Sequence, residues 1–314
     1  MGLDWPKRYQ KWVSGENNWG QMKCRFNSEL LHEGVTPGTN ATLTIYVRLF
    51  LFERNAKDAH MIRDPKDGRD IRDWAPGEFR AFRDAVKSKS DEFWNKRFTL
   101  VNNRYDISTF DVKAGSDTVR PNVDCCFALI WADSPADAHQ TINCFCPNTG
   151  KEITNFVNGS DVGNGVGQFS HNMVKTINLP TPFQVTCTRD VGDPLKPLEM
   201  KREKYACTQM VDHLGVAHEV GHLLGLPHVG VARRSHQCLK AMADKPEEGG
   251  NARMCYAGDG PSHASNIMGM GNEVHHWNAM PWAIRMFKHT GIGPASWGVA
   301  VDEKVLPKVI RAAA

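Results

Sequence analysis

The sequence predicts an α+β fold with several apolar strands, a long amphipathic helix and a second helix that carries the functional residues. Residues 41–52 are an apolar run rich in Thr, Ile, Val and Leu, and residues 123–132 are apolar enough for a central strand. Residues 76–98 place apolar side chains near the 3.6-residue period of an amphipathic helix. The chain then becomes polar and Gly-rich before a last helical stretch at 278–290, which predicts a smaller, mostly irregular C-terminal part ending in a helix.

The overall composition is that of a globular protein with a sizeable core. The chain has 314 residues, of which 41% are hydrophobic and 23% are charged. A net charge of +3 is too small to indicate nucleic acid or an anionic membrane as a partner. No apolar run is long enough to span a bilayer. We therefore expect neither nucleic acid nor membrane among the partners.

The remaining elements follow in chain order. Residues 1–40 are expected to be irregular, because prolines and glycines interrupt them repeatedly. Residues 98–102 and 182–188 are expected to be short strands. A helix is predicted over 201–224, with an apolar stripe on one side and two histidines on another.

The most informative stretch of the sequence is residues 218–228. His218 and His222 are four apart, so on a helix both imidazoles face the same way and can reach one metal ion. Glycine at 225 can adopt the left-handed conformation that ends a helix, which allows His228 to return as a third nitrogen ligand. Three protein ligands plus one water form the open tetrahedral site of catalytic zinc. Glu219 is placed to act on that water without being a ligand.

This stretch resembles the metzincin signature, H-E-x-x-H-x-x-G-x-x-H, at all of its fixed positions. The resemblance also implies a tight methionine turn downstream, and Met268 in the sequence Asn-Ile-Met-Gly matches it. Many metzincins have a tyrosine two residues after that methionine, whereas this chain has Met270, so a tyrosinate ligand is not expected.

The resemblance implies a metzincin-like zincin with a twisted mixed sheet, a long backing helix and an active-site helix. This fold has three parts. These are an irregular N-terminal segment at 1–40, an upper catalytic subdomain at 41–228 and a lower subdomain at 229–314 with the methionine turn and the last helix. Metzincins pair an edge strand with an extended substrate, and residues 169–177 are our candidate for that strand. They often carry structural Ca²⁺ as well, for which the loop at 159–167 is a candidate; a plain loop is the alternative.

The implied activity is that of a zinc-dependent metalloendopeptidase acting on a protein or peptide substrate. A zinc-activated water would attack the peptide bond, with Glu219 as general base and then general acid. His275 or His276 is a candidate for contact with the oxyanion or the substrate, although both fit exposed histidines at a helix start. A cell-wall peptide amidase and a delivered antibacterial effector, which would have an inhibitor or immunity protein as partner, use the same chemistry. A non-catalytic binding module on a zincin scaffold is a further alternative, and the oligomeric state is left open.

Cysteine usage points to an oxidising compartment. The chain has nine cysteines, an odd number that leaves at least one thiol outside intramolecular disulfides. We expect several disulfides, with Cys238 and Cys255 as a reasonable pair because they flank a polar Gly-rich loop. The expected destination is secreted, periplasmic or extracellular, by an unspecified route, since no signal peptide is visible. No C-x-x-C pair is present, so the sequence does not indicate a second, structural zinc site.

Overall fold

The structure is a computed structural model that describes residues 12–13, 16–19, 22–32, 34–63, 70–102, 110–114, 117–157, 166–191 and 201–310. The chain divides into two compact units. The first contains residues 1–175, 215–226 and 274–314, and the second contains residues 176–214 and 227–273. Among the described residues, no helix is both long enough and apolar enough to cross a bilayer.

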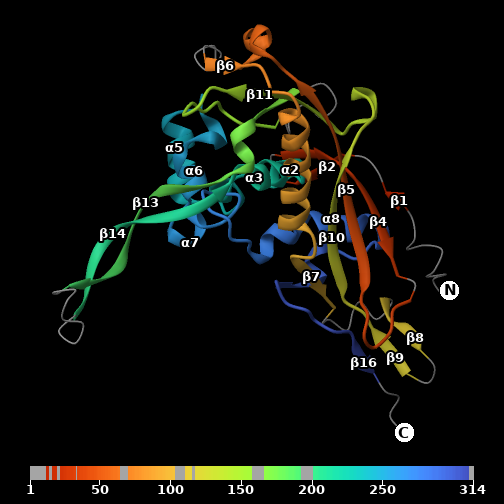
Figure 1. Cartoon of the computed structure of the whole chain (residues 1–314). Coiled ribbons are helices and arrows are strands. Elements are labelled where there is room, and N and C mark those ends of the chain that lie inside the picture. The colour runs from red at the N-terminus through yellow and green to blue at the C-terminus, as the bar shows by residue number, and fades with distance from the viewer. Residues whose placement is uncertain are drawn as a thin grey trace. The chain divides into compact units, whose positions relative to one another are not determined.

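A curled mixed sheet forms the framework of the first unit (Figure 1). Its long strand β5 (Ala41–Glu53) pairs in parallel with β10 (Val123–Trp131) and with β11 (Gln140–Pro147). On its other side β5 pairs antiparallel with β4 (Asn27–Leu31). Alternate residues of β5 and β10 are buried, which is the pattern of strands with one face on a core.

The shorter strands of the first unit extend this sheet or form small sheets of their own. The large sheet also contains β1 (Trp12–Val13), β6 (Ile71–Arg72), β7 (Phe98–Val101), β12 (Val166–Ser170) and β15 (Gly298–Val301). Small antiparallel sheets are made by β2 (Glu16–Trp19) with β3 (Met22–Arg25), and by β8 (Val112–Ala114), β9 (Asp117–Arg120) and β16 (Lys308–Ile310).

Three helices pack in the first unit. The long helix α2 (Glu78–Trp94) lies along β10 and buries Phe82, Val86, Ser90 and Trp94, one residue per turn. At its end the Trp94 indole Nε1 donates a hydrogen bond to the carbonyl oxygen of Ala217 at 3.0 Å, which fixes α3 (Gly215–Leu223) against α2. The last helix, α8 (Met280–Thr290), ends at Gly291, whose φ of 77° is the left-handed conformation of a helix C-cap.

Short 3-10 turns connect these elements. They are η1 (Ala56–Met61), η4 (Pro135–Asp137), η5 (His171–Val174), η8 (His276–Ala279) and η9 (Pro294–Ser296) in the first unit, and η7 (Gly249–Asn251) in the second.

The second unit combines a long hairpin with short helices. Strands β13 (Thr176–Val191) and β14 (Lys201–Leu214) pair antiparallel as a two-stranded ribbon (Figure 1), and the Cys187–Cys207 disulfide joins them. The helices are α4 (Val229–Ala232), α5 (His236–Asp244), α6 (Arg253–Ala257) and α7 (Pro261–Ala264). The Cys238–Cys255 disulfide joins α5 to α6, which confirms the predicted pair. The two disulfides are typical of an oxidising environment.

The predicted helix over 201–224 is wrong for its first 14 residues. Residues Lys201–Leu214 form β14, and the helix begins only at Gly215. Residues 201–214 contain an apolar stripe at helical spacing, but β13 pairs with nearly all of them on either side of a register shift between Pro180 and Gln184. The Cys187–Cys207 disulfide also joins the two strands. Tertiary pairing therefore overrides the helical period here.

The other sequence-based elements differ from the structure mainly in their limits. The strands predicted at 41–52, 98–102, 123–132 and 182–188 are present, as are the helices at 76–98 and 278–290 in shortened form. The candidate edge strand at 169–177 is interrupted, because η5 separates β12 from β13. Strands β1 to β4 lie in the segment that was expected to be irregular, and short helices occupy much of the C-terminal part.

A buried histidine just before β11 makes stability depend on pH. His139 Nδ1 accepts a hydrogen bond from the backbone N–H of Arg48 on β5 at 3.0 Å, which requires a neutral ring. Burial, and secondarily the charge of Arg48, lowers the pKa of His139 to about 3. Below the ordinary histidine pKa of about 6.5, the unfolded chain takes up a proton that the folded chain does not, so the free energy of unfolding falls as pH falls from there towards 3.

We expect the His139→Asn protein to lose less stability on acidification than the natural chain. One such group contributes up to about 2 kcal/mol between pH 7 and pH 5. Urea unfolding at the two pH values measures the difference, with the exposed His60→Asn as control. An equal loss in the natural chain and in His139→Asn would contradict this account of the group.

Candidate metal centre

Three histidines from the stretch 218–228 come together in the structure. His218, His222 and His228 each place a ring nitrogen within 4.8 Å of the others, and all three residues are buried. His218 and His222 lie one turn apart on α3, with ring centroids 4.8 Å apart and ring planes nearly perpendicular. A group of this size and chemistry can hold a metal ion, as the spacing in the sequence predicted.

The end of α3 explains how the chain reaches His228 so soon after the helix. The backbone N–H of Gly225 donates to the carbonyl of His222, and that of Leu226 donates to the carbonyl of Gly221. This pair of bonds is the Schellman arrangement, and the φ of 90° at Gly225 is the left-handed conformation that it requires. A Cβ at Gly225 would also lie 2.6 Å from the sulfur of Cys24, so glycine is needed for space as well. The predicted role of Gly225 is confirmed.

Two of the three imidazoles are held in the tautomer that a metal needs. His222 Nδ1 lies 2.7 Å from the carbonyl oxygen of Leu226, and His228 Nδ1 lies 2.7 Å from that of Gly250. A carbonyl oxygen only accepts hydrogen bonds, so each Nδ1 carries a proton, and in the neutral ring Nε2 is the unprotonated nitrogen. Metal-binding histidines are commonly oriented by such a bond from the other ring nitrogen. The carbonyl groups of Leu226 and Gly250 carry no sequence signal, so inspection of the sequence alone did not find them.

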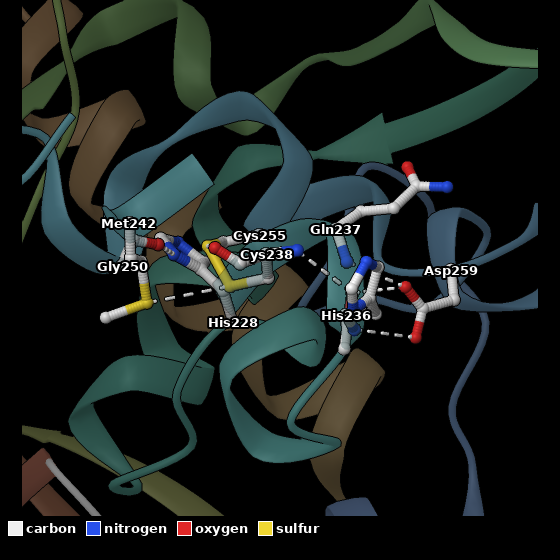
Figure 2. The surroundings of a disulfide bond; sticks show 9 residues. His228, His236, Gln237, Cys238, Met242, Gly250, Cys255 and Asp259 are labelled. Carbon is white, nitrogen blue, oxygen red and sulfur yellow. Dashed lines mark hydrogen bonds between the residues drawn. A yellow bond between two sulfur atoms is a disulfide. The ribbon is translucent and has the colours of Figure 1, made fainter. Parts of the chain in front are cut away.

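His228 is buried in the second unit. Figure 2 includes it among the residues around the Cys238–Cys255 disulfide, and its Nδ1 donates a hydrogen bond to the carbonyl oxygen of Gly250. The Tyr256 ring centroid lies 3.7 Å from that of His228. The residues after His228 form α4, where a Cβ at Gly230 would lie 2.7 Å from the carbonyl oxygen of Cys255. The disulfide-linked helices thus restrict the segment that begins at His228.

Met268 lies in a tight buried turn, and its place beneath a zinc site stays a prediction. The side chain of Met268 is fully buried, and its backbone N–H donates to Asn266 Oδ1 at 2.9 Å. The turn closes with the N–H of Gly269 on the carbonyl of Asn266. The carbonyl of Met268 accepts from the N–H of Val229 at 2.8 Å, which joins the turn to the residue after His228.

Glu219 is buried and one of its oxygens is unsatisfied. Among the described residues, Glu219 Oε2 has no hydrogen-bond partner. Burial raises the pKa of the Glu219 carboxyl to about 8, and a hydrogen bond with the backbone of Val157 opposes that shift. A buried polar atom without a partner is unusual and calls for an explanation, such as a water or an ion that belongs in the site.

The other sequence candidates are not part of the histidine group. His275 is the N-cap of η8, where its backbone N–H donates to Asn278 Oδ1 at 2.7 Å, and His276 is exposed. Their contact with an oxyanion or substrate stays a prediction. Most of the candidate calcium loop at 159–167 lies outside the described residues.

Comparison with known proteins gives no relative on which to base an assignment. No protein-family model, no curated protein and no solved structure matches this chain.

Proposed function

We propose that the chain is a zinc-dependent endopeptidase with a metzincin-like site. The main support is the histidine triad: three buried imidazoles converge, and backbone carbonyls accept hydrogen bonds from the Nδ1–H groups of His222 and His228. Imidazole sites bind zinc, copper and iron. Three neutral imidazole ligands, with a water as the fourth ligand, are one composition of catalytic zinc sites.

In this proposal the histidines and Glu219 have different roles in hydrolysis. His218, His222 and His228 would hold the zinc. When bound, zinc supplies a water of lowered pKa, near 7, and a positive charge that polarises the substrate carbonyl. Glu219 accepts a proton from the attacking water and then donates it to the leaving amine. The unpartnered Oε2 of Glu219 supports this role, because a structural carboxylate would have its oxygens satisfied.

The substrate in this proposal is a protein or peptide outside the cytoplasm. The two disulfides favour a secreted, periplasmic or extracellular location. A cell-wall peptide amidase, including a delivered antibacterial effector with an immunity protein, is the second candidate, because the same site would cut a peptide bridge. A non-catalytic zincin module is disfavoured by Glu219, which metal binding alone does not need.

Removal and return of the metal test the proposal. The natural chain should cut a denatured protein mixture, lose that activity on treatment with a chelator and regain it when zinc is added back. Mass spectrometry of the new termini identifies the bonds, and purified cell-wall peptides in a parallel assay separate the second candidate from the first. A chain that binds zinc and cuts neither substrate would favour the non-catalytic module. A chain that binds no zinc at the triad would overturn the proposal.

A further inference from the structure

A second group of metal-ligating side chains lies in the first unit, formed by Glu78, Cys146 and His171. Each offers one ligand atom, and these atoms lie within 4.8 Å of one another. Glu78 is the first residue of α2, Cys146 lies near the end of β11, and His171 begins η5. The three residues come from distant parts of the sequence, so no spacing motif could reveal them.

The framework holds each of these side chains in place. Cys146 is paired across the sheet with Arg72 on β6. The guanidinium of Arg72 binds both oxygens of Glu78, at 2.6 and 2.8 Å, and the backbone N–H of Ala75 binds Glu78 Oε2. The turn η5, which carries His171, packs against both α2 and β11. These contacts fix the carboxylate beside the sulfur without using the lone pairs of the sulfur or of the imidazole.

Two observations point to a ligand in this group. The Nδ1 atom of His171 is buried and has no hydrogen-bond partner among the described residues. The Cys146 thiol donates a hydrogen bond to Glu78 Oε1, with Sγ 3.7 Å from that oxygen, a separation that a shared metal ion would also accept. Zinc bonds of about 2.3 Å to sulfur and about 2.0 Å to oxygen, at a tetrahedral angle, place these two atoms about 3.5 Å apart.

We propose that Cys146 Sγ, His171 Nδ1 and a carboxylate oxygen of Glu78 bind a second metal ion, zinc or a divalent cation of similar softness. Thiolate, imidazole and carboxylate are all zinc ligands. Binding releases the thiol proton of Cys146 to water, because the thiolate is the ligand. Arg72 then orients the carboxylate from behind, as a hydrogen-bonding group outside the ligands does in many metal sites.

The role of such an ion would be structural. It would join the first turn of α2 to β11 and η5, three elements that pack against one another in the first unit. This site is independent of the histidine triad and of the proposed peptidase activity. It also revises the expectation drawn from the sequence, where the lack of C-x-x-C pairs gave no sign of a second site.

Cobalt substitution tests the second site, because the triad contains no sulfur. The metal-free, disulfide-intact chain is titrated with Co²⁺ and followed by absorbance, and bound zinc is counted in parallel. We expect a thiolate-to-cobalt charge-transfer band in the near ultraviolet and two equivalents of zinc per chain. Cys146→Ser should abolish the band and remove one equivalent, while the d–d bands from the triad remain. Cys126→Ser, which replaces a half-buried thiol on β10, should keep the band.

A second variant covers the case in which Cys146→Ser does not fold. His171→Asn changes a half-buried side chain. It should lower the affinity of the second site for cobalt, measured from the charge-transfer band, by at least about 10-fold, while the triad bands titrate as before. The absence of a charge-transfer band in the natural chain, or its persistence in Cys146→Ser, would overturn the proposal. Neither result depends on whether the chain hydrolyses peptides.

Discussion

Glu219→Gln is expected to bind as much zinc as the natural chain and to cut protein about 10²–10⁴-fold more slowly, as kcat/KM. Glutamine has nearly the shape of glutamate but cannot accept a proton, so the change removes the general base and leaves the three imidazoles in place. Metal analysis and steady-state cleavage of one peptide identified from the protein digest measure the two effects separately. Glu247→Gln, an exposed change in the second unit, serves as the control.

The stability of the metal-free protein distinguishes lost chemistry from a lost fold. Burial raises the pKa of Glu219 to about 8, whereas in the unfolded chain the carboxyl has its ordinary value. At pH 7 the Glu219 carboxyl therefore takes up a proton on folding, which lowers the free energy of unfolding. This loss of stability grows as pH rises from 4.5 towards 8, and it is absent when residue 219 is glutamine. The melting temperature of metal-free Glu219→Gln at pH 7 should equal or exceed that of the natural chain. Full activity in the variant, or a parallel loss of zinc, would show that Glu219 is not the base.

The triad was predictable from the sequence because its geometry is local. A spacing of four residues on one helix and a glycine that ends it are enough to bring His218, His222 and His228 together. The sequence could not show which ring nitrogen of each histidine is protonated. That depends on the carbonyl of Gly250, which comes from a loop 22 positions away whose path the Cys238–Cys255 disulfide restricts.

Non-local pairing accounts for what the sequence did not predict. Residues 201–214 have an apolar period compatible with a helix, yet they form β14 because β13 and a disulfide pair with them. In the same way Cys146 approaches Glu78 across 68 positions of sequence, through the strand pairing that puts Cys146 opposite Arg72. The period of apolar residues indicates the local preference of a segment for helix or strand. Pairing with other segments of the fold determines which of the two forms.

His228→Ala is expected to cost the triad most of its zinc affinity. Loss of a hydrogen bond that supports a ligand costs roughly 10–100-fold in metal affinity, and loss of a ligand itself costs more than that. Two imidazoles on one helix turn cannot complete the tetrahedral set that zinc prefers. Zinc competition with a chromophoric chelator measures the change, and cleavage activity should disappear with the bound metal. His236→Ala is the matched control, because His236 is an exposed histidine of the second unit whose backbone N–H, not its side chain, binds Asp259.

The variant must also be separated from a simple loss of packing. The His228 ring stacks on Tyr256 and donates to the carbonyl of Gly250, so alanine removes both contacts and is expected to lower stability even without metal. His228→Gln keeps a donor and a longer side chain, so it should recover part of the metal-free melting temperature without recovering the zinc affinity. If His228→Gln restored zinc binding together with stability, His228 would act by supporting the loop at Gly250. If zinc affinity stayed low while stability returned, the metal bond of His228 would account for the loss.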